Sequence, residues 1–235
     1  MSERTEVPVH PAATVICVRD AAHGLEVLLV QRNSKLVFHG GAWVFPGGRV
    51  EATDSPEHGP DASSEQAARA AAVRESLEET SLPLRTESLV PLSHWTTPPG
   101  LPRRFSTWFF LADAPNGDVV VDDGEIKQHW WAPPRAALER RAAGAIELPP
   151  PTFVSLMWLN SMPSVEQAVT AAQRQPFERF VPRPIARPDG VVSLYQGDAG
   201  YVDRDFDQPG PRHRLYMLNH GWRYERTAPP GAGGD

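Results

Sequence analysis

The chain of 235 residues contains one cysteine, Cys17, so an internal disulfide is excluded. Cys17 lies in the apolar run 13–18, and we expect it to be a small buried core residue rather than a reactive thiol. No stretch approaches the roughly 20 apolar residues of a membrane-spanning helix. Residues 1–9 are polar and lack the apolar centre of a signal peptide. We therefore expect a cytoplasmic protein with no membrane partner.

Positive charge is also scarce. The chain has 23 Lys and Arg residues against 29 Asp and Glu residues, which gives a formal net charge of -6. A nucleic-acid backbone as the main partner is disfavoured, because its phosphates require clustered basic residues. A small anionic substrate is still compatible with this charge, because a bound metal ion can reverse the local field. The sequence is also compatible with a homodimer.

The length and the 40% hydrophobic content suit one domain with an extension. We expect a flexible tail at 1–11, the main domain at 12–175, an extension containing a hairpin at 176–227 and a disordered tail at 228–235. Apolar runs at 13–18 and 26–31, separated by the turn-forming segment 20–24, predict a β-hairpin. Other strands are expected at 43–45, 89–96, 106–112, 125–131, 191–195, 214–218 and 222–226. Further helices are expected at 134–143, 151–159 and 164–174.

The segment 65–79 has no Gly or Pro and is rich in alanine, so it predicts a helix. Ser63 followed by Gln66 has the spacing of a capping box at its start. Ala70, Val73 and Leu77 recur at helical spacing, and we expect them to form the buried stripe.

Three carboxylates share one face of this helix. Glu75, Glu78 and Glu79 stand at positions i, i+3 and i+4, where they repel one another unless a cation holds them. Mg²⁺ binds proteins through a few carboxylates together with substrate phosphate oxygens. Arg74 stands four residues before Glu78, so it can brace the cluster by a charge-assisted hydrogen bond.

A solvated acidic helix face is the alternative interpretation of these glutamates. The upstream segment favours a site instead. Pro46, Gly47 and Gly48 end a predicted strand, and glycine there lets the backbone approach a phosphate or the helix closely. The acidic residue Asp54 then follows before the helix. This combination is much rarer than any of its parts.

The combination resembles the Nudix family, whose characteristic box starts with a glycine, has an acidic residue six positions later and ends in Arg-Glu-apolar-x-Glu-Glu-x-Gly-apolar. The matching residues here are Gly48, Asp54, Arg74, Glu75, Glu78, Glu79 and Leu82. Asp54 is shorter than the family's glutamate, and Ser76 and Ser81 replace an apolar residue and a glycine. Nineteen residues (55–73) separate Asp54 from Arg74, an insertion of 12 that we place in the loop 55–62 and the first helical turn.

A second motif just upstream resembles that of coenzyme A diphosphatases within this family. Arg32, Leu36, Gly41 and Phe45 fall at matching spacing, whereas Val30 and Asn33 replace the motif's threonine and serine. Peroxisomal-type coenzyme A members also carry an insertion in the box. The resemblance covers roughly residues 12–160.

The resemblance implies a Nudix α/β/α sandwich with a mixed β-sheet, here followed by a small C-terminal β-rich extension. It implies Mg²⁺ or Mn²⁺ held by Glu75, Glu78 and Glu79, with Glu78, Glu79 and Arg74 in catalysis. The reaction would be hydrolysis of a phosphoanhydride bond in a nucleoside diphosphate linked to another moiety, with coenzyme A or acyl-coenzyme A as the first candidate. ADP-ribose, dinucleotides, nucleotide sugars and a non-catalytic ligand sensor stay open as alternatives.

The candidates for substrate binding are Arg32, Gly47, Gly48 and Arg104. Arg32 and Arg104 can each contact a phosphate, but either can also be an ordinary surface or loop residue. Asp54 and Glu125 are candidates for additional roles in the site. Glu125 precedes a predicted strand and is either a further base or ligand, or a solvated turn residue.

Overall fold

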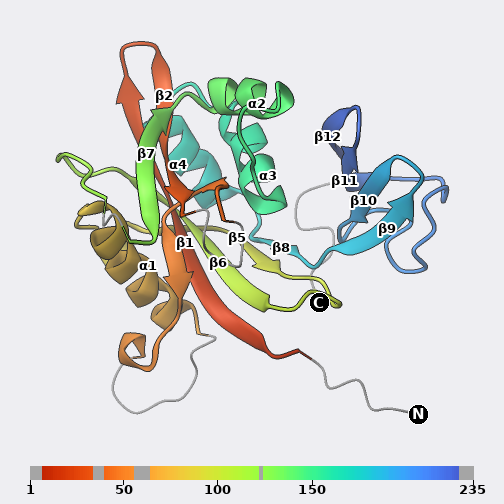
Figure 1. Ribbon diagram of the computed structural model, residues 1–235, viewed down its shortest axis with the longest axis horizontal. Coiled ribbons are helices and arrows are strands. Elements are labelled where there is room, and N and C mark those ends of the chain that lie inside the picture. The colour runs from red at the N-terminus through yellow and green to blue at the C-terminus, as the bar shows by residue number, and fades with distance from the viewer. Residues whose placement is uncertain (1–6, 34–39, 56–63, 122–123, 228–235) are drawn as a thin grey trace.

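The computed structural model describes residues 7–33, 40–55, 64–121 and 124–227. Residues 1–6, Leu36, most of the insertion (56–63) and the predicted tail 228–235 lie outside the described residues. The described chain forms a large sheet between two helical layers, and a smaller sheet at the C-terminal end (Figure 1). The predicted α/β/α sandwich with a mixed sheet and a β-rich extension is confirmed.

The N-terminal hairpin organises the large sheet. Strand β1 (Val9–Ala21) pairs antiparallel with β2 (Gly24–Arg32), as the turn signals predict. On its other side β1 pairs in parallel with β6 along its length, starting at Val9 opposite Arg104. Residues 9–11, which we expected in a flexible tail, therefore belong to the sheet.

The large sheet has eight strands in the order β3-β2-β1-β6-β5-β8, and β4 and β7 pair with β1 and β2 beside that path. The bounds of the remaining strands lie close to the predicted segments, except for β4 and β8, which the sequence did not predict. These strands are β3 (Trp43–Val44), β4 (Gly47–Arg49), β5 (Val90–Thr96), β6 (Arg104–Asp113), β7 (Ile126–Ala132) and β8 (Glu178–Phe180).

Alternation along β1 divides the core into two layers. Ala13, Val15 and Cys17 point to one face and pack with helix α1 (Glu65–Thr80), whereas Ile16 and Val18 point to the opposite face. Cys17 is fully buried, as predicted, and burial raises the pKa of its thiol to about 12. Two apolar clusters on opposite faces of one sheet define the sandwich.

Helix α1 corrects one prediction. Its buried side consists of small residues, because it lies against the sheet, and Leu77 is 52% exposed. The expected stripe of Ala70, Val73 and Leu77 is therefore wrong. The side chain of Ser64 caps the helix by accepting a hydrogen bond from the backbone N–H of Ala67 (3.1 Å), one residue later than expected. The buried positions are Ala67, Ala68, Ala71, Ala72, Ser76, Glu79 and Thr80.

The opposite face of the sheet is covered by α2 (Pro134–Ala142), α3 (Pro150–Leu159) and α4 (Val165–Arg174), close to their predicted positions (Figure 1). Two short 3-10 turns, η1 (Ala52–Asp54) and η2 (Thr86–Ser88), flank α1 in the sequence. Within the described ranges, no helix combines the length and the apolar character needed to cross a membrane.

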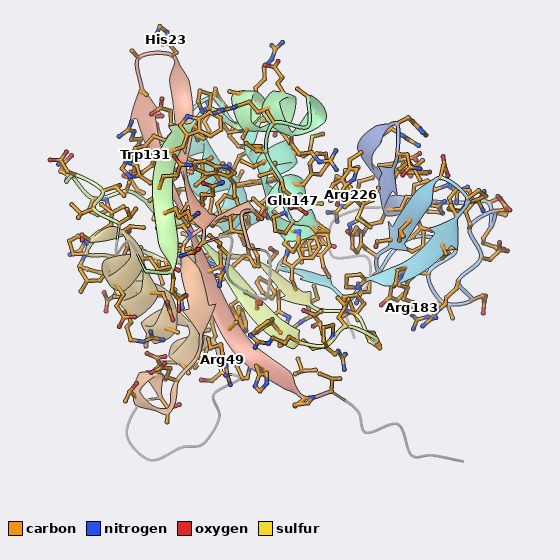
Figure 2. All side chains as sticks on the ribbon, in the orientation of Figure 1. His23, Arg49, Trp131, Glu147, Arg183 and Arg226 are labelled. Carbon is orange, nitrogen blue, oxygen red and sulfur yellow. The ribbon has the colours of Figure 1, made fainter. Side chains whose placement is uncertain are left out.

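The second sheet has the order β12-β11-β10-β9. Its hairpin of β11 (His213–Leu218) and β12 (Gly221–Arg226) was predicted, as was β10 (Gly190–Leu194), whereas β9 (Arg183–Arg187) was not. Figure 2 shows Arg226 on the side of this sheet that faces the helices and Arg183 at its lower end. The Arg226 guanidinium is 2.6 Å from the Glu178 carboxylate of β8, which ties the two sheets together.

Candidate active site

The strand β4 places the glycine pair directly against helix α1. The backbone N–H of Gly47 donates to Oε2 of Glu79 (2.9 Å). Gly47 has a φ of +152°, and a Cβ there would overlap the backbone of β1 at Ala13 and Thr14. A Cβ on Gly48 would instead overlap the carboxylate of Glu75. Both glycines are therefore required by close packing, one against a strand and the other against a charged side chain.

Arg74 is the centre of an ion-pair network on α1. Its Nε and Nη2 each lie 3.0 Å from the Asp54 carboxylate, which is nearly buried. Its Nη1 donates to Oε1 of Glu75 (2.9 Å) and to Oε2 of Glu78 (3.0 Å). The predicted contact from Arg74 to Glu78 is confirmed. The hydrogen bond to Asp54 is the main reason why the pKa of Arg74 lies above its ordinary value.

Two of the three glutamates are held where ionisation is unfavourable. Burial raises the pKa of Glu75, although Arg74 opposes this effect. Burial raises the pKa of Glu79 to about 8; the Gly47 N–H and Arg32 lower it, whereas Glu75 and Glu125 raise it. Among the described residues, the buried Glu79 carboxylate accepts one hydrogen bond from a backbone donor, the N–H of Gly47. Both carboxylates are therefore costly to ionise unless a further cation or donor compensates their charge.

The remaining carboxylates lie at the rim of this group. The side chain of Glu78 is 57% exposed and that of Glu125 is 65% exposed. Glu125 acts electrostatically on both Glu75 and Glu79, and its Oε2 is 4.0 Å from Nη2 of Arg32. The structure thus brings Glu125, at the start of β7, towards the helix glutamates. The Nε of Arg32 is buried and has no hydrogen-bond partner among the described residues.

The carboxylates of this group are the residues that would hold the expected Mg²⁺ or Mn²⁺. Within the described ranges, no three His, Cys, Asp or Glu side chains stand together as a preformed cation site. Glu75 and Glu78 are turned towards Arg74, and Glu79 towards Gly47. The chemistry nevertheless fits, because carboxylate oxygens are the ligands of hard divalent cations and the raised pKa values of Glu75 and Glu79 mean that a further cation favours their ionisation.

A cavity of about 700 Å³ opens beside Gly47, and its described lining does not include Gly48. Arg32 and Gly47 line one part of it, and the loop 96–101 lines another. Its other walls come from the start of α3 and from the C-terminal sheet, through residues that include Val191, Met217 and Trp222. A volume of this size is typical of small-molecule sites. The contribution of the C-terminal sheet was not predicted from the sequence.

Arg104 does not join the candidate site. It is buried at the start of β6, and its Nε donates to the backbone carbonyl of Thr97 (3.2 Å). The described residues that line the cavity do not include it. Its place in the fold is to fix the loop that follows β5, and the expectation that it contacts substrate has no geometric support.

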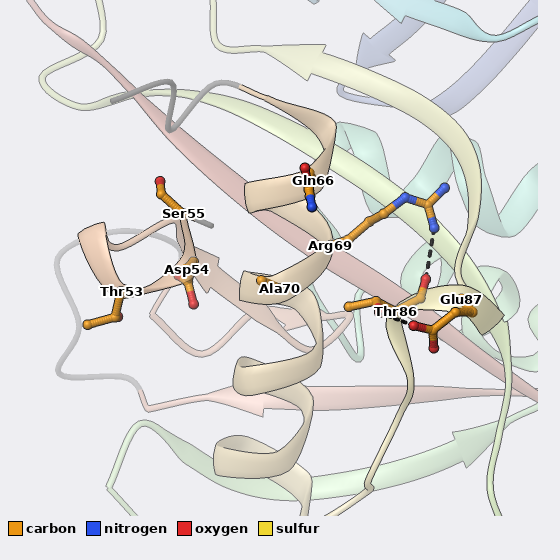
Figure 3. Close-up of a pocket in the computed structure, with 8 residues that line it drawn as sticks. All are labelled: Thr53, Asp54, Ser55, Gln66, Arg69, Ala70, Thr86 and Glu87. Atoms are coloured by element: carbon orange, nitrogen blue, oxygen red, sulfur yellow. Dashed lines mark hydrogen bonds between the residues drawn. The ribbon is translucent and has the colours of Figure 1, made fainter. Parts of the chain in front are cut away.

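A second hollow, of about 490 Å³, lies on another side of α1 (Figure 3). Gln66, Arg69 and Ala70 of α1 line it together with Asp54 and the turn η2. Arg69 spans the hollow's edge and donates to the carbonyl of Thr86 (2.9 Å). Of the site residues, only Asp54 is part of this lining as far as the chain is described, so this hollow is separate from the glutamates.

The comparisons with known proteins agree with this geometry. The family model described as "NUDIX domain" matches residues 8–150. The chain belongs to the Nudix family. The match includes the glycine pair, Asp54 and all of α1, and it ends at Pro150, the first residue of α3, before the C-terminal sheet.

Relatives within the Nudix family cover different parts of the chain. The acyl-coenzyme A diphosphatase NUDT19 of Homo sapiens is 33% identical over 121 residues, which are 48% of this chain and 32% of that protein. The chain thus matches about a third of the length of this relative. The putative nudix hydrolase 7 of Caenorhabditis elegans is 26% identical over 76% of this chain and 70% of its own length. A NUDIX hydrolase structure from Alicyclobacillus acidocaldarius shares the fold, with a TM-score of 0.62 at 24% identity, over 70% of this chain and 96% of that one.

Proposed function

We propose that this Nudix protein hydrolyses the phosphoanhydride bond of coenzyme A or of an acyl-coenzyme A. The observation that carries the proposal is the position of Glu79. Its buried carboxylate, with a pKa raised to about 8, is hydrogen-bonded to Gly47, and Gly47 and Arg32 line the cavity. A proton acceptor with a pKa near neutrality beside an anion-binding wall suits general-base catalysis at phosphorus.

The chain's own residues divide the work. Arg32 offers an N–H donor that has no partner in the described chain, and a substrate phosphate oxygen is a suitable acceptor for it. Gly47 lines the cavity without a side chain of its own, so a diphosphate can approach its backbone, whereas Gly48 leaves room for the Glu75 carboxylate. Arg74 does not line the cavity; it holds Asp54, Glu75 and Glu78 in place and is a positioning residue.

Glu75, Glu78 and Glu79 would hold Mg²⁺ or Mn²⁺. A bound divalent cation neutralises charge on the diphosphate and lowers the pKa of a bound water. Glu79 or Glu78 then accepts the proton of the attacking water, while Arg32 stabilises the phosphate charge. Water oxygen bonds to one phosphorus, the bond from that phosphorus to the bridging oxygen breaks, and each of the two products keeps one phosphate group.

The choice of substrate rests on two further observations. Arg32, Gly41 and Phe45 match the spacing of the coenzyme A motif. The human relative that is 33% identical over 121 residues is named an acyl-coenzyme A diphosphatase. For coenzyme A itself, the products would be adenosine 3′,5′-bisphosphate and 4′-phosphopantetheine.

The test is a substrate panel of coenzyme A, an acyl-coenzyme A, ADP-ribose, a dinucleotide and a nucleotide sugar, with Mg²⁺ and then Mn²⁺ in millimolar excess. Products are identified by mass spectrometry, and a chelator control accompanies each substrate. We expect turnover of the coenzyme A compounds that stops with chelator. Fast turnover of ADP-ribose with untouched coenzyme A would overturn the substrate assignment, and full turnover in chelator would overturn the metal assignment.

A further inference from the structure

The C-terminal sheet presents one face to the cavity that reaches Gly47 and Arg32. In its register, Val191 of β10 lies opposite Met217 of β11, and Met217 lies opposite Trp222 of β12. Residues directly opposite each other point to the same face of a sheet. All three line the cavity. Together with Pro184 and Ser193, a second opposed pair that also lines it, they form a mainly apolar wall.

This wall is fixed to the Nudix sandwich rather than hanging from it. The ring of Trp222 packs edge-on against Phe153 of α3, with centroids 5.4 Å apart, and the Arg141 guanidinium lies 3.8 Å from its centre. On the other side, Arg226 pairs with Glu178 of β8, which belongs to the large sheet. A wall held at both ends can discriminate between substrates, because its position does not depend on the ligand.

The cavity therefore has two chemically different ends. Arg32 and Gly47 suit a diphosphate, whereas Val191, Met217 and Trp222 offer no charge and few hydrogen bonds. A substrate that fills both ends must carry an apolar group beyond its diphosphate. Free coenzyme A ends in a pantetheine arm that is broken up by two amides, whereas an acyl thioester of coenzyme A adds a continuous hydrocarbon chain.

We propose that the C-terminal sheet is the specificity wall of the enzyme and that it binds the acyl chain of acyl-coenzyme A substrates. This inference rests on the proposed function and concerns residues outside the part of the chain that matches the Nudix model. A buried methylene contributes about fourfold in affinity, so burial of three to four methylenes gives roughly a 100-fold preference for an acyl-coenzyme A over coenzyme A.

The experiment compares two variants that add the same ring to opposite faces of this sheet. Val191→Phe fills the cavity. Ile185→Phe is the matched control, since Ile185 of β9 neighbours Ala186, the partner of Val191, and therefore points away from the cavity. Both parent residues are half-buried and β-branched. Values of kcat and KM are measured for coenzyme A and octanoyl-coenzyme A, and octanoyl-coenzyme A binding is measured by calorimetry in chelator.

We expect Val191→Phe to raise the KM and the dissociation constant of octanoyl-coenzyme A at least tenfold. The KM of coenzyme A should change by less than twofold. Ile185→Phe should change neither. Met217→Ala, which removes apolar contact without adding bulk, should also weaken the binding of octanoyl-coenzyme A. This variant covers the case in which Val191→Phe fails to fold.

Other outcomes overturn the proposal in distinguishable ways. If Val191→Phe weakens both substrates equally, the wall binds a part common to both, and the acyl assignment is wrong although the proposed function stands. If neither wall variant changes any constant, the wall does not contact the substrate. If the parent hydrolyses neither compound but does hydrolyse ADP-ribose, the proposed function itself fails and takes this inference with it.

Discussion

Two acidic side chains in this protein are equally buried, but their pKa values are shifted in opposite directions. Glu79 on α1 and Asp198 in the C-terminal sheet region are each 5% exposed. Burial raises the pKa of Glu79 to about 8. Burial would also raise the pKa of Asp198, but Arg214 and two backbone N–H groups outweigh that effect and lower it.

The difference lies in the number of donors. Asp198 accepts from Nε and Nη2 of Arg214, both at 2.7 Å, and from the N–H groups of His213 (2.8 Å) and Gly200 (2.9 Å). Glu79 accepts from Gly47. A satisfied buried charge stabilises its surroundings, whereas an incompletely satisfied one is available to a ligand. The first residue is thus expected to be structural and the second functional.

The sharpest way to break this comparison is Glu79→Gln. It keeps the shape and a hydrogen-bond acceptor for Gly47 but removes the proton acceptor and one metal ligand, so kcat should fall by about 10²–10⁴-fold. Steady-state rates at saturating Mg²⁺ check this expectation, with circular dichroism as the control for folding. A near-parental rate would show that this helix face is not the active site.

Arg214→Ala should have the largest effect on stability. It leaves the buried Asp198 carboxylate without its main partner, which costs about 3–5 kcal/mol of unfolding free energy. The matched control is Arg135→Ala, because the side chains of the Arg135–Glu139 pair are 80% and 63% exposed and the pair should contribute little to stability. Urea denaturation measures both variants. Equal losses would contradict the contrast between satisfied buried charge and exposed charge.

The two glycines separate function from folding on a smaller scale. In Gly48→Ala the new methyl group displaces the Glu75 side chain, so kcat/KM should fall about 10–100-fold while the unfolding free energy changes by less than about 1 kcal/mol. In Gly47→Ala the methyl group meets the backbone of β1, and stability should fall by about 1–3 kcal/mol. Thermal melts and rate assays of both variants test this expectation. A stability loss in Gly48→Ala that matches the loss in Gly47→Ala would contradict it.

The smallest effect is a change in pH dependence without metal. The pKa of Glu79 is raised on folding. Its favourable contribution to the stability of the folded protein is therefore present below its unfolded pKa, near 4.5, and is lost as pH rises towards 8. Asp198 shows the reverse, because its pKa is lowered and its contribution is lost as pH falls. In chelator, the free energy of unfolding of Glu79→Gln should therefore rise relative to that of the parent by on the order of 1–3 kcal/mol between pH 5 and pH 8. Denaturant titrations across this range that show a constant difference would contradict the raised pKa.

Local patterns in the sequence predicted those elements whose formation depends on neighbouring residues. The β1–β2 hairpin, α1 and the β11–β12 hairpin follow from turn signals and from residue periodicity. The i, i+4 contact from Arg74 to Glu78 follows from helical geometry alone. The sharing of one face by Glu75, Glu78 and Glu79 is likewise a consequence of the helical period.

Features without a clear local signal were missed. Strand β8 is short and its partner β5 lies far back along the chain, whereas β9 pairs with the next strand, β10, but contains Pro184. The exposure of Leu77 was not predicted because an alanine-lined helix can approach the sheet closely, so its largest apolar residue need not face the core. The burial of Arg104 and the cavity wall from the C-terminal sheet depend on tertiary packing that no single motif encodes.

The ion pair of Arg74 and Asp54 spans the insertion in the Nudix box. Its two hydrogen bonds of 3.0 Å join residues on either side of the insertion and hold helix α1 against the η1 turn. Lengthening a closed loop from 7 to 19 residues costs only about 1 kcal/mol, because closure entropy grows with the logarithm of length. Evolution could therefore elongate this segment, and engineers can graft a reporter peptide there, at little thermodynamic expense.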